Sequence, residues 1–272
     1  MRSYDEYRHI MSLWESGVNK KAIAQQTGIP RTTVQACIER FQDTQGLEAY
    51  STQWNLSVTT RQKVLLQLQD DGKEHSNAKK AYAYLFGLYL GDGGISRNER
   101  VYRLRVSLDL KYSQIIAECV QAIETLLPDN QVGIVERYYK GHPCNVDVSC
   151  YYKYWPLVLP QHGTGMKHMR SIVLEPWQQQ VVDTYPLLFW KGLYHSDGSR
   201  FSNVVNGTDY PRYSFTNMSF DIITLFCDTC DRLGIHWTRK ERQADTALKT
   251  YDVFISRRKD VAFLDREVGP KR

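Results

Sequence analysis

The chain has 272 residues, of which 42% are hydrophobic, so it can build a folded core and is not a wholly disordered protein. The net charge of +5 permits a polyanionic partner without establishing one. No apolar run has the length of a signal peptide or a membrane span, so we expect a soluble cytoplasmic protein with six reduced cysteines, associated with the nucleoid if the source is bacterial.

Residues 1–45 are predicted to form a small all-α domain of three short helices. The segment 20–35 resembles a helix-turn-helix. Ala24 is small enough for a close helix crossing, Gly28 suits the turn, and Val34 would face inward. Side chains early in the second helix would contact DNA, and a three-helix bundle without a DNA role is the alternative. These side chains are Arg31, Thr32, Thr33 and Gln35.

A polar linker is predicted at residues 46–78, followed by a longer region that contains an internal duplication. Two segments, residues 84–93 and residues 189–198, align without gaps at an offset of 105 (189 − 84 = 105). The same offset separates Asp147 from Asp252. Two equal spacings, joined by the same order of elements, indicate a duplicated domain.

Each repeat is predicted to have the order αββαββ with a further helix. The first repeat with its connector spans residues 79–182, and the second spans residues 183–272. The amphipathic helices in the middle of the repeats are expected at residues 113–127 and 220–233. The fold class is therefore α+β, with an antiparallel saddle sheet packed on helices, and one chain with pseudo-twofold symmetry is expected to act as a monomer.

Polar and apolar residues alternate along the predicted strands, which leaves one sheet face polar and partly basic. An ordinary solvated face is the alternative, but four such strands favour a surface that reads DNA groove edges and phosphates. The candidate DNA-binding residues are Arg103, Arg105, Ser107, Asn145, Asp147, Ser149, Arg212, Ser214, Thr216, His236, Thr238, Lys240, Thr250 and Asp252.

Asp92 and Asp197 each end an apolar helix and precede a glycine. A carboxylate is electrostatically unfavourable at a helix C-terminus, and two of them brought together by symmetry would repel each other. A shared divalent cation such as Mg²⁺ resolves that repulsion, so both aspartates are predicted metal ligands. Small residues four positions apart would let the two helices approach closely. They are Gly87 and Gly91 in the first helix and Gly192 and Ser196 in the second.

The motifs GLYLGDG (residues 87–93) and GLYHSDG (residues 192–198) resemble those of single-chain LAGLIDADG homing endonucleases, over roughly residues 79–268. The resemblance implies a saddle of strands in the DNA major groove and metal-dependent hydrolysis of both strands at a long site, with Asp92 and Asp197 as catalytic, metal-binding residues. Leu90 and His195 stand where the family name suggests a further acidic residue.

The family usually places a basic residue near the scissile phosphate. Lys153 and Arg258 are the candidates, because both follow the last strand of their repeat at the offset of 105. A solvated lysine and arginine are the alternative. The connector segment 162–170 is glycine-rich and basic and is predicted to be a linker that contacts the DNA backbone. The spacing of Cys227 and Cys230 places both on one helix face and favours buried packing over a metal site.

The sequence leaves two other functions open. One is a non-cleaving transcriptional regulator, since a LAGLIDADG-like domain beside a helix-turn-helix resembles certain sporulation regulators. Those regulators generally lack the acidic motif residues, whereas both are present here, which favours the enzyme. The other is an RNA-splicing maturase on the same scaffold, which no feature of the chain singles out.

Overall fold

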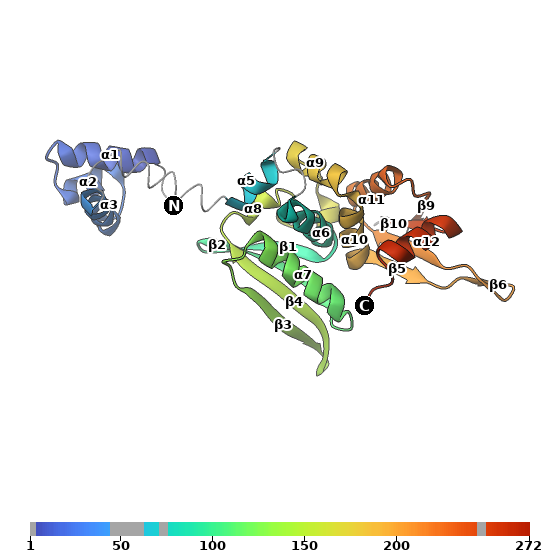
Figure 1. The fold of residues 1–272 in the computed structure, drawn as a ribbon. Helices are drawn as coiled ribbons and strands as arrows, with labels where there is room; N and C mark the ends of the chain where they lie inside the picture. Colours follow the sequence, from blue (N-terminus) through green and yellow to red (C-terminus); the bar gives the residue numbers. More distant parts are fainter. Residues whose placement is uncertain (1–3, 44–62, 71–75, 244–248) are drawn as a thin grey trace. The chain divides into compact units, whose positions relative to one another are not determined.

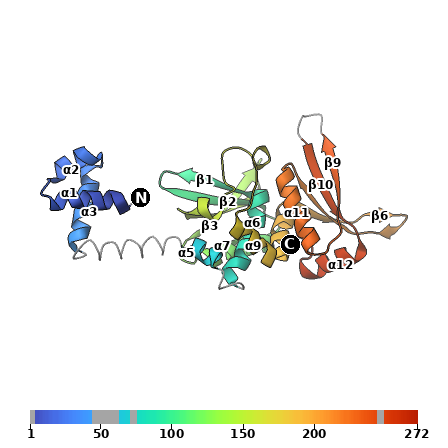
Figure 2. The same cartoon turned by 90° about the horizontal axis from the view of Figure 1, so that it is seen from above.

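The computed structural model describes residues 4–43, 63–70, 76–243 and 249–272. The chain divides at residue 63 into two compact units, each with its own hydrophobic core. Figures 1 and 2 show the ribbon from two directions. No helix in the described part of the chain combines the length and the apolar composition that crossing a membrane requires.

The smaller unit contains α1 (Tyr4–Glu15), α2 (Lys20–Thr27) and α3 (Arg31–Asp43). Helix α2 begins after Asn19, whose side-chain oxygen accepts two backbone N–H groups of the first turn. It ends at Gly28, whose φ of 67° lies in the left-handed region that favours glycine. Val34 is fully buried beside Ile23 and Ile38, which confirms its inward position.

The predicted linker at residues 46–78 lies partly outside the described residues. Within it, α5 (Lys63–Gln69) is described, and its Val64 and Leu68 are buried in the core of the larger unit. The proposed domain boundaries at residues 45 and 78 remain predictions.

The first repeat has the predicted order of elements. It consists of α6 (Asn77–Asp92), β1 (Gly93–Asn98), β2 (Val101–Asp109), α7 (Ser113–Leu126), β3 (Val132–Tyr139), β4 (His142–Tyr152) and α8 (Trp155–Val158). The connector then contains the 3₁₀ turn η1 (Lys167–Met169) and α9 (Pro176–Thr184).

The second repeat follows the same order with one inserted hairpin. It consists of α10 (Pro186–Asp197), β5 (Gly198–Phe201), β6 (Val204–Val205), β7 (Thr208–Asp209), β8 (Arg212–Asn217), α11 (Phe220–Arg232), β9 (Thr238–Gln243), β10 (Lys249–Ile255) and α12 (Arg258–Glu267). The inserted β6–β7 hairpin turns at Asn206 and Gly207, both with positive φ. Figure 1 shows it projecting from the rest of the repeat.

Each repeat carries its own four-stranded antiparallel sheet, in the order β1-β2-β4-β3 and β5-β8-β10-β9. Asp147 pairs with Ser107 on one side, and Asp252 pairs with Thr216 at the matching place in the second sheet. The α+β class and the repeated αββαββα order are therefore confirmed. The described strands of the two repeats thus form two separate four-stranded sheets, besides the two-stranded β6–β7 hairpin, rather than one continuous sheet.

One predicted strand begins later than expected. The alternation in residues 235–240 placed His236 on the polar sheet face, but β9 begins at Thr238. Gly234 has a φ of 68°, and the His236 N–H donates to the Asp260 carboxylate, so this segment turns before the strand starts. The position of His236 on the sheet was therefore wrong.

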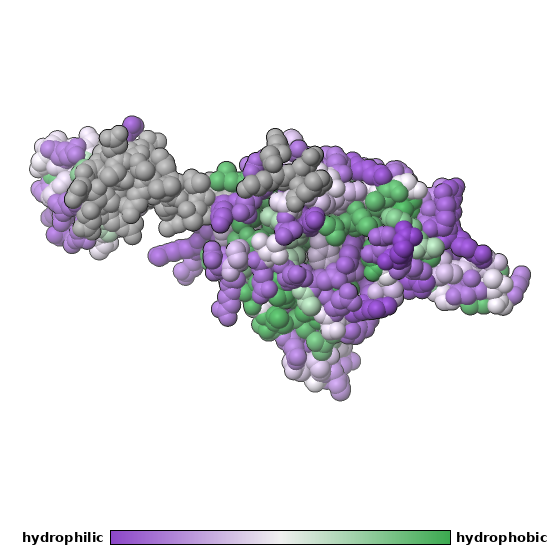
Figure 3. Space-filling view, in the orientation of Figure 1, coloured by the Kyte–Doolittle hydropathy of each residue, from purple (hydrophilic) through white to green (hydrophobic). Residues whose placement is uncertain are grey.

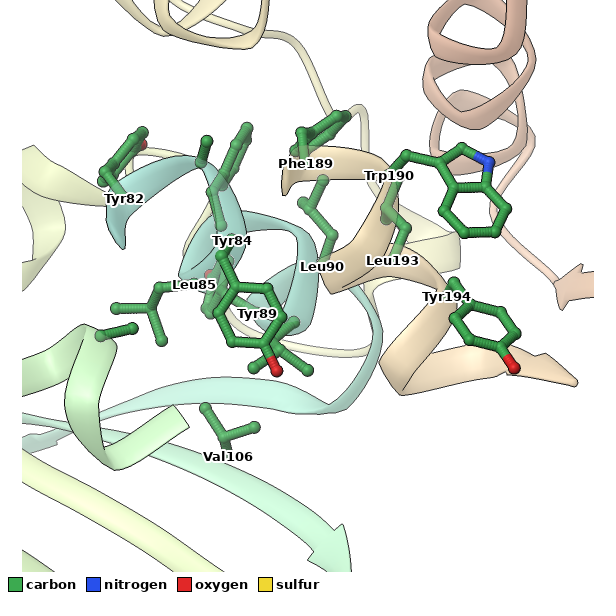
Figure 4. Packing of buried hydrophobic residues seen from close by; sticks show 14 of the residues in the cluster. Tyr82, Tyr84, Leu85, Tyr89, Leu90, Val106, Phe189, Trp190, Leu193 and Tyr194 are labelled. Carbon is green, nitrogen blue, oxygen red and sulfur yellow. The ribbon is translucent and has the colours of Figure 1, made fainter. Parts of the chain in front are cut away.

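Helices α6 and α10 lie between the two sheets and carry the centre of the core (Figures 1 and 2). Figure 4 shows Trp190 and Tyr194 directed away from α6, toward the elements of the second repeat. There the Trp190 ring lies 5.6 Å from that of Phe226, between ring centroids. Helix α6 is buried on nearly every side from Tyr82 to Leu90, as its apolar sequence requires. In Figure 3 hydrophilic residues cover most of the visible face of the larger unit, with apolar residues in a few patches.

Cys227 and Cys230 are 3% and 0% exposed on the inner face of α11, within the same core. Burial raises the pKa of both thiols, so they stay protonated at neutral pH. The prediction of buried packing is confirmed.

Candidate functional site

The backbones of α6 and α10 are in direct contact where both helices carry glycine. A methyl group on Gly87 would lie 2.5 Å from the carbonyl oxygen of Phe189, and a methyl group on Gly192 would overlap the carbonyl oxygen of Tyr84. Side chains larger than hydrogen are therefore excluded at both positions. Near the C-terminal end of the pair, Gly91 faces Ser196 at the same close approach.

This close packing brings the two motif aspartates to one place. Gly91 directly precedes Asp92 in the chain. The Asp197 Oδ2 atom lies 2.7 Å from the point that a methyl group on Gly91 would occupy. Burial and the neighbouring Asp197 charge together raise the pKa of Asp92 to about 7, against the opposing effect of two lysines. Burial also raises the pKa of Asp197, against an Asn217 N–H that donates to its Oδ2 atom at 2.8 Å.

Two lysines that the sequence did not single out as site residues stand beside these carboxylates. The Lys167 ammonium donates to the carbonyl oxygens of Tyr89, Gly91 and Gly93, at the C-terminal end of α6. The Lys271 ammonium donates to the carbonyl oxygen of Ser196, at the C-terminal end of α10, over 2.8 Å.

The last carbonyl groups of a helix have no partner within the helix, and each lysine donates hydrogen bonds to such groups. Each lysine also places a positive charge at the negative, C-terminal end of the helix dipole. Burial lowers the pKa of Lys167 to about 8, against the raising effect of Asp197 and Asp92. The two lysines are related by an offset of 104, close to that of the repeat, which is a signal that the sequence already contained.

A cavity of about 620 Å³ opens beside the aspartates. Its lining includes Asp197, Asn217, Lys167 and the two glycines that flank Asp92. Residues of both repeats and of the connector therefore line the cavity. The connector is held in place by Arg170, whose guanidinium donates to four carbonyl groups of its own loop. Lys167 and Arg170 of this loop thus both donate to carbonyl groups of the protein itself.

Lys153 and Arg258 are not among the residues that line this cavity. Lys153 lies between β4 and α8, with its ammonium 5.8 Å from the centre of the Tyr154 ring, and Arg258 is exposed at the start of α12. The cations that the structure brings to the aspartates are Lys167 and Lys271.

His195 lies behind the aspartates in the helix interface. It is 6% exposed, and its Nδ1 atom lies 2.9 Å from the hydroxyl oxygen of Tyr84. Burial lowers its pKa to about 3, helped by the Lys191 and Lys271 charges, so the imidazole is neutral at pH 7. Leu90, the corresponding position in α6, is fully buried.

The paired carboxylates meet the chemical needs of a divalent cation. A cation would stabilise the ionised forms that burial and mutual repulsion disfavour. The described residues hold no cluster of three or more His, Cys, Asp or Glu side chains, so further ligands would come from water, backbone carbonyls or a substrate phosphate. Asp92 and Asp197 would hold the ion.

The polar face of the first sheet is basic and internally bonded. Arg105 is exposed and Arg103 half-buried on it, and an Arg103 N–H donates to the Ser149 hydroxyl at 3.1 Å. Asp147 is only 2% exposed, because Ser107 and Arg137 donate to its two carboxylate oxygens.

The second sheet repeats this arrangement. Asp252 is 5% exposed and accepts hydrogen bonds from Thr216 and Arg242. The candidates that remain accessible on the two polar faces are Arg103, Arg105, Ser107, Asn145, Arg212, Ser214, Thr216, Thr238, Lys240 and Thr250. The sequence reading missed Arg137 and Arg242, although their offset of 105 matches that of the aspartates.

In the smaller unit the candidate side chains lie at the start of α3. Arg31, Thr32 and Gln35 are exposed, and Thr33 is half-buried. The Gln35 amide donates to the Glu39 carboxylate one turn later, at 2.8 Å. These side chains are accessible to a partner.

No protein-family model matches the chain, and no curated protein matches it. Solved structures do match. The homing endonuclease I-DmoI in complex with DNA and Mn is 16% identical, with a TM-score of 0.48, over 71% of this chain and 98% of that one. I-DmoI in complex with DNA and Ca is 18% identical, with a TM-score of 0.48, over 72% and 95%. The N-terminal LAGLIDADG domain of WhiA is 16% identical, with a TM-score of 0.45, over 72% and 86%.

The features on which the resemblance of the sequence depended are present in the structure: two αββαββα halves, a four-stranded antiparallel sheet in each, and two packed helices that end at Asp92 and Asp197. The larger unit of this chain has a LAGLIDADG-like fold.

Proposed function

We propose that the chain is a site-specific endonuclease that hydrolyses both strands of DNA with Mg²⁺ or another divalent cation. The observation that carries the proposal is the meeting of Asp92 and Asp197 at the ends of two helices whose backbones touch. A protein without a ligand for this place would gain stability by losing one carboxylate, since burial and mutual repulsion both oppose their ionisation.

Asp92 and Asp197 would hold the cation, which supplies an activated water and stabilises charge on the leaving oxygen. Asn217 fixes the orientation of the Asp197 carboxylate through its hydrogen bond. Lys167 and Lys271 hold the helix ends rigid, and their charges favour the ionised carboxylates at neutral pH. The duplicated fold offers one carboxylate from each repeat, so a single chain can act as a monomer on both strands.

The polar faces of the two sheets would read the DNA site. Arginine, lysine, serine and threonine side chains on these faces can donate to base edges and phosphates. The exposed start of α3 would add a second contact from the smaller unit.

A second candidate function is a DNA-binding regulator that does not cleave. One observation favours it: Lys167 and Lys271 already place two positive charges beside the aspartates, so the pair is partly neutralised without metal. The sheet faces and α3 would serve such a regulator equally well.

Site selection followed by cleavage separates the two functions. A random double-stranded DNA library is selected for binding in Ca²⁺, and the enriched site is then incubated with Mg²⁺. We expect cleavage by the wild type and a rate at least about 100-fold lower for Asp92→Asn and for Asp197→Asn, because each removes several kcal/mol of metal-mediated charge stabilisation.

Both variants should still bind the site, and Asp129→Asn, at an exposed turn of the first repeat, serves as the control with unchanged cleavage. Binding of the enriched site without cutting by the wild type would favour the regulator. Wild-type rates in either aspartate variant would refute the assigned centre.

A further inference from the structure

The polar sheet faces carry two arginine–aspartate pairs that are related by the repeat. In the first sheet the Arg137 Nε and Nη2 atoms both lie 2.6 Å from the Asp147 Oδ2 atom. In the second, Arg242 Nε donates to Asp252 Oδ2, and Arg242 Nη2 donates to Asp252 Oδ1 at 2.8 Å.

The two pairs occupy the same register. Arg137 stands opposite Asn145, which precedes Asp147 by two residues. Arg242 stands opposite Thr250, which precedes Asp252 by two residues. Both arginines lie on the last strand of their sheet, β3 and β9. All three relationships between the repeats have an offset of 105, so the pairs are equivalent under the pseudo-twofold symmetry.

Each carboxylate is buried and fixed, whereas each arginine is accessible. The side chains of Asp147 and Asp252 are 2% and 8% exposed, against 50% and 65% for Arg137 and Arg242. Ser107 donates to Asp147 at 2.9 Å and Thr216 donates to Asp252 at 2.7 Å, so each carboxylate is held from the neighbouring strand as well. Hydrogen bonds from arginine and hydroxyl groups keep the pKa of both carboxyls low against their burial.

The geometry leaves one edge of each guanidinium available. An arginine side chain has five N–H donors, and the carboxylate engages the edge formed by Nε and one proton of Nη2. The other edge, formed by Nη1 and the second proton of Nη2, faces away from the carboxylate. These two donors have the spacing that matches O6 and N7 of guanine in the major groove.

We propose that Arg137 and Arg242 each recognise one guanine, at symmetry-related positions in the two halves of the DNA site, and that Asp147 and Asp252 orient them. The inference rests on the proposed DNA binding of the sheet faces and adds which base each repeat reads. It also gives the buried aspartates a positioning role in place of the direct DNA contact expected from the sequence.

Two other readings make different predictions. An arginine that contacts only a phosphate contributes affinity without base preference, and lysine can replace it because the charge is kept. An arginine in an ordinary solvated ion pair contributes neither. Replacement by lysine therefore separates base recognition from both of these cases, since lysine keeps the charge but lacks the two-pronged fork.

The test is selection of the full-length chain on a random double-stranded DNA library in Ca²⁺, with wild type, Arg137→Lys and Arg242→Lys. We expect the wild type to select a site with one guanine in each half, at symmetry-related positions on opposite strands. Arg137→Lys should lower the preference for guanine at one position by about tenfold or more, and Arg242→Lys should do so at the other. Asp147→Asn should lower the preference for guanine at the same position that Arg137→Lys affects.

Arg97→Lys is the matched control, because Arg97 is an exposed arginine whose register partner Tyr102 packs on the core, so it lies on the opposite face of the first sheet. Its selected site should equal that of the wild type. Thermal melting of every variant checks that it is folded.

Unchanged base preference in both arginine variants, or an equal loss of affinity on all sequences, would overturn the inference. Failure of the proposed nuclease is a separate result. A wild type that selects the site but does not cut it in Mg²⁺ refutes cleavage, and the position-specific loss of guanine would still support the two arginines as base readers.

Discussion

Gly192 lies directly on the backbone of Gly87, so that a methyl group added to Gly192 would be 3.0 Å from the Gly87 Cα atom. This contact sets the separation of the two helices that carry the motif aspartates. Because the carboxylates stand one turn beyond it, the stability of the helix pair and the chemistry at its end depend on the same two residues.

Gly192→Ala is therefore expected to destabilise the protein by about 1–3 kcal/mol, the usual effect of overpacking. An alanine without a steric conflict in a helix would instead stabilise by roughly 1 kcal/mol relative to glycine. Gly94→Ala is the control, since a methyl group there meets no atom within 4 Å. Urea unfolding of the three proteins measures the effect, and equal or higher stability of Gly192→Ala would contradict the close contact.

The raised pKa of Asp92 predicts a pH-dependent loss of stability in metal-free buffer. The folded protein keeps the Asp92 proton up to about pH 7, whereas the unfolded chain loses it near 3.8. Between these values the folded state binds more protons, so stability falls as the pH rises, and the full penalty applies above pH 7.

Asp92→Asn removes this penalty. The variant should match the wild type near pH 4 and exceed it at pH 8 by up to about 4 kcal/mol, because one pKa unit corresponds to about 1.4 kcal/mol. Urea unfolding in EDTA at the two pH values measures this difference. Asp109→Asn should show the opposite sign, since hydrogen bonds from Lys111 lower the pKa of Asp109. An Asp92→Asn variant less stable than the wild type at pH 8 would refute the repulsion.

Metal binding should reverse the same penalty. At pH 8 we expect Mg²⁺ to raise the melting temperature of the wild type, because a ligand that binds only the folded state stabilises it. The increase should shrink at pH 5, where Asp92 holds its proton. It should vanish in the double variant Asp92→Asn with Asp197→Asn. A melting temperature that responds to Mg²⁺ equally in the double variant would place the ion elsewhere.

The smaller unit is expected to add affinity for DNA rather than catalysis. Removal of residues 1–45 should weaken binding to the selected site by roughly 10- to 100-fold, as the loss of one of two linked contacts does. Cleavage at saturating protein should persist, since Asp92 and Asp197 lie in the other unit. Arg31→Ala in the full chain tests the same contact without truncation. Undiminished affinity in both proteins would argue for a bundle without a DNA role.

The sequence predicted much of this architecture because the duplication supplied two independent copies of each signal. Matching motifs fixed where α6 and α10 end, and the alternation in β2, β4 and β8 predicted the correct buried faces. The equal spacing of Asp147 and Asp252 corresponded to equal register in the two sheets.

The structural features that the sequence did not predict depend mainly on contacts between distant segments. Lys167 sits in a glycine-rich loop and Lys271 in the last residues of the chain, where no periodicity indicates which carbonyl groups they meet. The early start predicted for β9 failed for a local reason, because Gly234 adopts a positive φ within an apparently alternating run. The Arg137 and Arg242 pairings required the sheet register before their shared offset had a meaning.

The most direct test is anomalous diffraction from Mn²⁺ in crystals of the protein with its selected DNA. We predict a peak at about 2.0–2.3 Å from carboxylate oxygens of both Asp92 and Asp197, the range expected for small divalent ions with oxygen ligands. A map with no peak between these two carboxylates, in crystals where Mn²⁺ is bound elsewhere, would contradict it.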